Sequence, residues 1–87
     1  MESAVKIALE EIRENPKVVY PYFNLSTSFY YLGDFQKSTA YFEKVEKRLP
    51  KRMLWYQIEP ILAYQKLGKY QRVFELTERI FAKGSFL

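Results

Sequence analysis

The chain has 87 residues, of which 48% are hydrophobic and 18% aromatic, and its formal net charge is +4. This length accommodates one small domain, and so many core-forming side chains exclude an intrinsically disordered chain. The absence of cysteine excludes a disulfide framework and a thiolate metal site, and the absence of histidine removes the commonest general base and metal ligand.

The first of five predicted helices covers residues 2–15. Its apolar residues recur at intervals of one, three and four positions: Ala4, Val5, Ala8, Leu9 and Ile12. Ser3 is the candidate N-cap. Asn15-Pro16 is expected to end the helix, because the residue before a proline disfavours helical geometry.

The second and third helices are predicted to form a hairpin around a tight turn. The second runs from Pro21, whose missing N–H costs nothing in a first turn, to about Leu32. Gly33 can adopt the left-handed conformation that commonly ends a helix. Asp34 is expected to cap the third helix, over residues 35–48, whose apolar face we expect to include Ala40.

The fourth helix is predicted over residues 52–67 and the fifth over about 70–83, with Gly68 and Gly84 following them. Pro60 lies near the middle of the fourth helix and is expected to kink or split it. No strand is predicted, because apolar residues do not alternate with a period of two. The short links between helices favour antiparallel neighbours, so we expect a stack of helical hairpins.

One stretch of sequence occurs twice. Its hinge reads Leu32-Gly33-Asp34-Phe35 in the first copy and returns 35 residues later as Leu67-Gly68-Lys69-Tyr70. Internal repetition of this length is typical of helical repeat arrays. Such arrays stack hairpins into extended surfaces that hold other molecules, so the repeat indicates a binding function.

The first copy also carries the residues of one known repeat pattern: Tyr22, Leu25, Ser26, Phe29, Gly33, Asp34, Phe35, Ser38, Phe42, Val45 and Pro50. With these residues the chain resembles the tetratricopeptide repeat family. The resemblance implies an all-α fold, a right-handed superhelical stack of antiparallel hairpins. It also implies that Ser26 and Ser38 lie where the two helices of a hairpin cross closely.

The resemblance covers nearly the whole chain as one domain of about two and a half units. Residues 1–16 resemble the second helix of a preceding unit, residues 19–52 form the first repeat, and residues 54–87 form a degenerate second repeat. Pro60 and Thr77 stand where the pattern has leucine and a large aromatic residue. Because repeat stacks usually need three or more units, we expect either that the chain is a piece of a longer protein or that its open ends are covered by another chain.

In this family the first helix of each hairpin lines a concave, peptide-holding groove, which the resemblance places here. The first hairpin is expected to contribute Tyr20, Phe23, Asn24, Thr27, Tyr30 and Tyr31, and the second Trp55, Ile58, Glu59, Leu62 and Lys66. Asn24 occupies the place of an asparagine that hydrogen-bonds the ligand backbone in many relatives. Tyr22 and Phe29 are assigned to the core.

The groove composition indicates the kind of ligand. Phe23 and Thr27 replace the lysine and asparagine by which one subclass of the family grips a C-terminal carboxylate. The resemblance therefore implies an apolar or amphipathic segment of a protein partner.

Three binding functions remain open. The first is a scaffold, adaptor or chaperone-like module for a protein or peptide, and the second is self-assembly into a homo-oligomer through residues 2–15 and the C-terminal hairpin. The third, which we favour least, is single-stranded RNA binding. It is considered because residues 35–87 carry a net charge of +6, whereas residues 1–34 carry −2.

Catalysis, cofactors and membrane insertion are not expected. The chain has no histidine or cysteine, and its glutamates are spaced for solvent-facing sides of helices rather than for a shared cleft. Charged residues interrupt every apolar run, so neither a signal peptide nor a membrane helix is predicted. We therefore expect a cytoplasmic, non-enzymatic protein.

Overall fold

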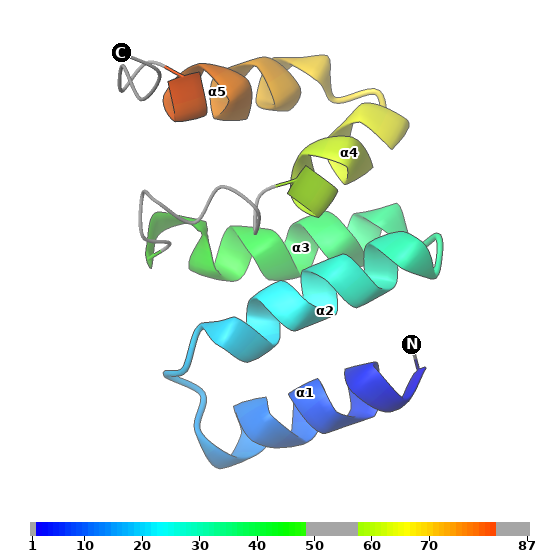
Figure 1. Ribbon diagram of the computed structural model, residues 1–87, viewed down its shortest axis with the longest axis vertical. Helices are drawn as coiled ribbons and strands as arrows, with labels where there is room; N and C mark the ends of the chain where they lie inside the picture. Colours follow the sequence, from blue (N-terminus) through cyan, green and yellow to red (C-terminus); the bar gives the residue numbers. More distant parts are fainter. Residues whose placement is uncertain (1, 49–57, 82–87) are drawn as a thin grey trace.

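A computed structural model of the protein describes residues 2–48 and 58–81, and within them the chain forms five α-helices and one short 3-10 helix. They are α1 (Glu2–Glu14), α2 (Tyr20–Tyr31), α3 (Phe35–Val45), η1 (Glu46–Arg48), α4 (Ile58–Lys66) and α5 (Tyr70–Phe81). Each α-helix packs against the next in sequence, and α2 also packs against α4. Figure 1 shows the helices stacked along the longest axis of the molecule. The described residues contain no strand, which confirms the all-α prediction.

The turn between α2 and α3 has the predicted chemistry. Gly33 has a φ of +85°, in the left-handed region that glycine adopts without steric cost. The N–H of Asp34 donates to the carbonyl oxygen of Phe29 at 2.9 Å, and the N–H of Gly33 donates to that of Tyr30 at 3.0 Å. The Asp34 carboxylate then accepts the N–H of Lys37 at 3.1 Å, which confirms it as the cap of α3.

The turn between α4 and α5 repeats this geometry 35 residues later. Gly68 has a φ of +76° and donates its N–H to the carbonyl oxygen of Gln65 at 3.0 Å. The N–H of Lys69 donates to the carbonyl oxygen of Tyr64 at 2.9 Å. The duplicated hinge in the sequence therefore corresponds to a duplicated helix-ending turn.

Some predicted helix boundaries and faces differ from the structure. Ser3 lies inside α1, which includes Glu2, so it is not the N-cap. The third predicted helix is α-helical only to Val45 and then tightens into η1. Pro60 is the third residue of α4 and is buried. Residues 52–57 and 82–83 of the predicted fourth and fifth helices, and any kink between the former and Pro60, lie outside the described residues.

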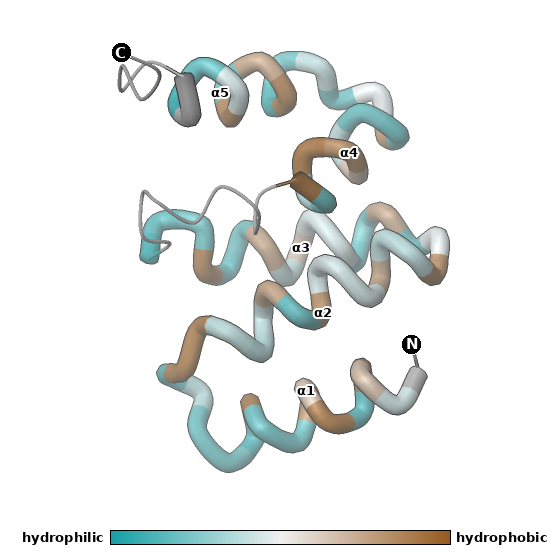
Figure 2. Tube along the Cα trace, in the orientation of Figure 1, coloured by the Kyte–Doolittle hydropathy of each residue, from teal (hydrophilic) through white to brown (hydrophobic). Residues whose placement is uncertain are grey.

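A hydrophobic core runs through four helices of the stack. Its buried members are Phe23 from α2, Phe42 and Val45 from α3, Tyr64 from α4 and Leu76 from α5. Figure 2 shows hydrophobic segments interrupted by hydrophilic ones along α1 and α5, as expected for amphipathic helices that bury one face. This core joins α2 to α3 and to the second hairpin, formed by α4 and α5.

The close crossing of α2 and α3 occurs where the sequence predicted it. Ser26 and Ser38 are both fully buried, and the Ser38 hydroxyl donates to the carbonyl oxygen of Ser26 at 2.7 Å. The two hydroxyl oxygens lie 3.3 Å apart. Beside this contact α3 buries Thr39, and Ala40 is exposed, so the prediction for Ala40 is wrong. The helix can bury Thr39 because its hydroxyl donates to the carbonyl oxygen of Gln36 at 3.1 Å.

A polar network joins the end of α3 to α4 and α5. The Arg72 guanidinium donates to Glu46 at 2.5 Å and to the Tyr64 hydroxyl at 3.3 Å, and Arg79 donates to Glu46 at 2.8 Å. Burial lowers the pKa of Arg72, but the hydrogen bonds to Tyr64 and Glu46 raise it above its ordinary value. For Tyr64 burial acts in the opposite direction and raises the pKa, because it disfavours the charged, deprotonated form. This network fixes the second hairpin against the first.

Candidate functional site

The solvent-facing side of α2 carries a line of four residues from the predicted groove. These residues, which we call the α2 stripe, are Tyr20, Asn24, Thr27 and Tyr31. They follow one another at intervals of four, three and four positions, which places them on one side of the helix. Tyr20 is 46% exposed and Tyr31 58% exposed, whereas Thr27 between them is partly buried. The stripe therefore has an aromatic side chain at each end and hydrogen-bonding groups in its middle.

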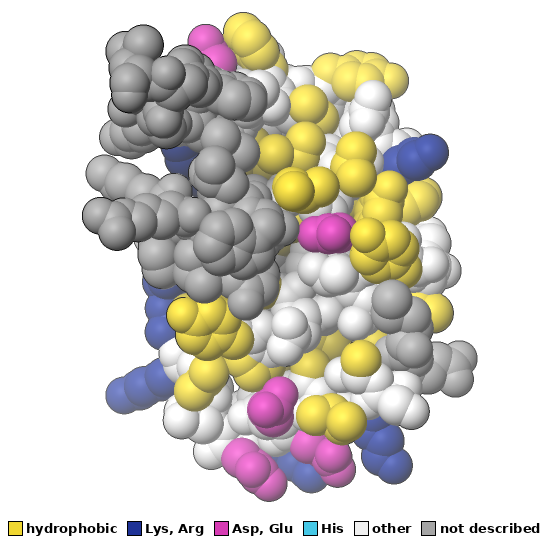
Figure 3. Space-filling model, viewed as in Figure 1, with side chains coloured by type: hydrophobic (Ala, Val, Ile, Leu, Met, Phe, Trp, Pro, Cys, Tyr) yellow, Lys and Arg dark blue, Asp and Glu magenta, His cyan; other side chains and the backbone are white. Residues whose placement is uncertain are grey.

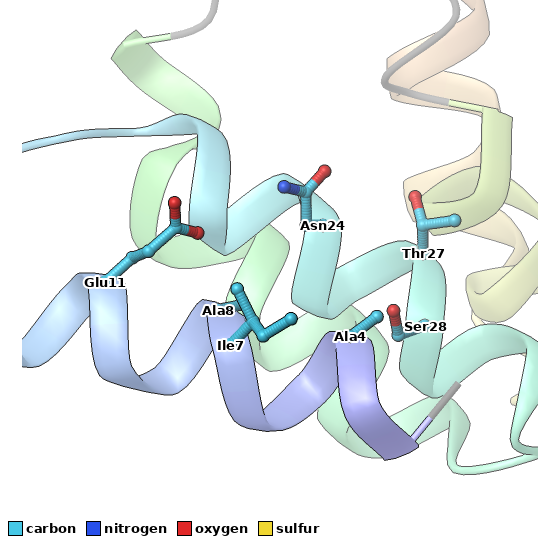
Figure 4. Close-up of a pocket in the computed structure, with 7 residues that line it drawn as sticks. All are labelled: Ala4, Ile7, Ala8, Glu11, Asn24, Thr27 and Ser28. Carbon is cyan, nitrogen blue, oxygen red and sulfur yellow. The ribbon is translucent and has the colours of Figure 1, made fainter.

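A pocket of about 430 Å³ opens beside the middle of the stripe, between α1 and α2. The α1–α2 pocket is lined by Ala4, Ile7, Ala8 and Glu11 of α1 and by Asn24, Thr27 and Ser28 of α2, which are drawn in Figure 4. The four α1 residues occur at the spacing of a single helix face. Two members of the α2 stripe thus form one wall of a groove whose other wall is α1.

Small side chains shape this pocket. Ala8 is 2% exposed and Ser28 5% exposed, so both lie at its floor, whereas Ile7 is 57% exposed at its rim. Volumes of roughly 300–1,000 Å³ are typical of ligand pockets, and this one can receive a large apolar side chain. The sequence prediction did not include the α1 residues in the site, although Ala4 and Ala8 recur at the spacing of small residues at a close helix contact.

The other end of the stripe reaches α4. The Tyr31 hydroxyl donates to a carboxylate oxygen of Glu59 at 3.2 Å, and the Tyr30 ring meets the Tyr31 ring edge-on at 5.1 Å between centroids. The negative charge of Glu59, and then the hydrogen bond to it, raise the pKa of Tyr31. The Tyr31 hydroxyl thus holds the Glu59 carboxylate beside the stripe.

The second hairpin contributes part of the predicted set. Ile58 is 52% exposed next to Glu59, Leu62 is partly buried, and Lys66 is exposed at the end of α4. Glu59, Leu62 and Lys66 share a helix face because they are three and four positions apart. Trp55, the remaining predicted residue of this hairpin, lies outside the described residues.

Phe23 is not part of the groove, so this prediction is wrong. It is 1% exposed, and its ring centroid lies 6.4 Å from that of Phe42 in the core. The reason is that α3 and α4 both pack on α2 and widen its buried side. Tyr22, which was assigned to the core, is partly buried and packs against it, whereas Phe29, also assigned to the core, is partly buried.

Among the described residues no cluster of histidine, cysteine, aspartate and glutamate could hold a metal ion. No described helix combines the length and apolar character that crossing a membrane requires.

Comparison of the chain with protein-family models, with curated proteins and with solved structures gives no match.

Proposed function

We propose that the protein is a non-enzymatic interaction module that holds an amphipathic segment of another protein along the α2 stripe. The observation that carries this proposal is the α1–α2 pocket, which shares Asn24 and Thr27 with the stripe. An apolar side chain of the partner enters the pocket while the rest of the segment lies along α2. The site needs no catalytic group for this role.

The side chains of the stripe suit such a segment. Tyrosines offer a large contact area with few rotatable bonds, and aromatic anchors dominate binding energies at interfaces. The Asn24 amide supplies both donors and an acceptor for a peptide group. The distance from Tyr20 to Tyr31 along α2 is about 16 Å, which corresponds to about three turns of a docked helix.

We further propose that the hairpins form a tetratricopeptide-like, right-handed stack. Three observations support this: the helix-ending glycine turns at Gly33 and Gly68, the buried contact between Ser26 and Ser38, and the packing of α2 on α4. In such a stack the first helices of successive hairpins form the binding surface.

Self-assembly is the second candidate, because apolar side chains are exposed at both ends of the stack. Ile7 is 57% and Leu9 43% exposed on α1, and Tyr70 is 66% and Phe74 58% exposed on α5. Sedimentation analysis at high protein concentration tests this candidate, which requires a dimer or larger species. RNA binding at the stripe is less well supported, because carboxylates lie on both sides of it and repel phosphates.

The proposed site is tested by replacing Asn24 and Tyr31 together by alanine. The probe is a fluorescein-labelled amphipathic model peptide of about three helical turns, with leucines on one face. We expect the double variant to bind it at least about tenfold more weakly, because losing one aromatic anchor commonly costs about 2 kcal/mol. Fluorescence anisotropy measures the affinity.

Tyr70→Ala is the matched control for this experiment, since Tyr70 is an exposed tyrosine on α5, away from the stripe. It should change the affinity by less than about twofold. Circular dichroism establishes that both variants are folded. Unchanged peptide binding by the folded double variant would show that the α2 stripe is not the site.

A further inference from the structure

The surroundings of the α2 stripe are opposite in charge to the chain as a whole. The chain carries a net charge of +4, yet a carboxylate flanks the stripe on each side, Glu11 from α1 and Glu59 from α4. No lysine or arginine of the described residues forms an ion pair with either carboxylate. The stripe is therefore bordered by two carboxylates whose negative charges are not paired with a lysine or arginine of the described residues.

Two arginines of the described chain have carboxylate partners away from the stripe. Arg72 and Arg79 are engaged with Glu46 on the side of α3 and α5. Lys66 shares a face of α4 with Glu59 but is seven positions away, about 10 Å along the helix. In Figure 3, lysine and arginine side chains lie mostly at the outline of the molecule, one acidic side chain lies among hydrophobic ones near the middle of the face, and several others lie at its lower end.

From this geometry we propose that the occupant of the site is a basic amphipathic helix. Resting on the proposed function, this inference names the chemistry of the partner at the same surface. The apolar face of the helix inserts into the α1–α2 pocket, and lysine or arginine side chains on its flanks reach Glu11 and Glu59. Opposite charges at the rim set the orientation of the partner and speed its association.

A helix fits the groove better than an extended strand. The walls are two helix faces, and ridges of one helix pack into the grooves between others. Ala4, Ala8 and Ser28 are small, which allows a helical backbone to approach α1 and α2 closely. In helix-in-groove recognition the bound helix presents apolar anchors at intervals of three and four residues, and the α1–α2 pocket would receive one of them.

The two carboxylates are well placed to receive cations. Glu11 lies at the pocket and is exposed, and Glu59 is held in place by the Tyr31 hydroxyl, which occupies one of its two oxygens. The second oxygen of Glu59 can accept a lysine or arginine donor.

Two probe peptides test the inference. Both are amphipathic helices of about three turns with the same apolar face, and they differ only in carrying lysines or glutamates on the polar face. We expect the lysine peptide to bind at least about tenfold more tightly than the glutamate peptide by fluorescence anisotropy. Raising the salt from about 50 to about 500 mM should reduce this preference, since the rim charges are exposed and screened.

Glu11→Gln and Glu59→Gln should each weaken binding of the lysine peptide about threefold, as expected for loss of an exposed ion pair. Glu10→Gln is the matched control, because Glu10 belongs to the other side of α1, with Lys6, Leu9 and Arg13. It should leave the affinity unchanged. An equal loss in the Glu10 variant would overturn the assignment of the two carboxylates.

The outcomes separate this inference from the proposed function. Equal affinity for the lysine and glutamate peptides would overturn the basic partner and leave the interaction site standing. Binding of neither peptide by the monomeric protein would overturn both. The inference would also be overturned if the protein forms a stable dimer that does not bind the lysine peptide, because a second copy of the chain would then occupy the site.

Discussion

Replacing Phe42 by alanine is expected to lower the free energy of unfolding by about 3–5 kcal/mol. Phe42 is 0% exposed and lies in the core with Phe23 and Tyr64, so its removal leaves a cavity that joins three helices. Domains of this size have total stabilities of roughly 4–13 kcal/mol. The variant should therefore be marginally folded or unfolded at room temperature, which urea titration followed by circular dichroism will measure.

Phe74→Ala is the matched control for this prediction. Phe74 is also an α-helical phenylalanine, but it is 58% exposed on α5. Its replacement should cost less than about 1 kcal/mol, since surface substitutions rarely disturb stability strongly. Equal destabilisation by the two substitutions would contradict the position of the core between the hairpins.

Replacing Ser38 by leucine is expected to destabilise the protein by about 3 kcal/mol. The site where α2 and α3 cross is fully buried, so a larger side chain must push the helices apart, and the contact with Ser26 is lost as well. Ser38→Ala removes the hydroxyl without adding volume. It should cost only about 1 kcal/mol, the usual net contribution of a buried hydrogen bond.

The order of these two effects is the informative result. Thermal unfolding of both variants measures this order, because a larger loss of unfolding free energy lowers the midpoint temperature further. A leucine variant as stable as the alanine variant would show that the helices do not approach closely at Ser38. A larger loss in the alanine variant would mean that the hydrogen bond, rather than the small volume, determines the contact.

Local chemistry explains why much of the fold could be predicted from the sequence. Gly33 and Gly68 adopt positive φ because a helix-ending turn of this kind requires it, and Asp34 caps α3 with its own carboxylate. Ser26 and Ser38 are small, so α2 and α3 can approach closely where these two residues meet. Each of these features depends on residues near in sequence or on size alone.

The site was harder to predict because it depends on contacts between distant residues. Phe23 has the spacing of a solvent-facing residue in the first hairpin considered alone, but the combined packing of α3 and α4 buries it. The bond between Tyr31 and Glu59 joins positions 28 residues apart. Helical periodicity predicts on which side of a helix each residue lies, but tertiary packing determines how wide the buried side of that helix is.

The α1–α2 pocket was likewise predicted only in part. Asn24 and Thr27 were predicted as binding residues from their place on α2, and the structure adds a facing wall from α1. Repetition in the sequence identified the hairpins, whereas the groove arises where α1, which lies outside the two repeated hairpins, meets α2. A search for small residues at intervals of four in α1 would have pointed to Ala4 and Ala8.

Chemical-shift mapping with the lysine peptide tests the central claim most directly. In a titration of isotope-labelled protein, we predict that the largest changes in backbone amide shifts occur at the α1–α2 pocket and along the α2 stripe, from Tyr20 to Tyr31. The amides of α5 around Tyr70 and Phe74 should change little. Largest changes on α5, or at the end of α3 and in η1, where Lys44, Lys47 and Arg48 lie, with none at the stripe would contradict the proposed binding surface.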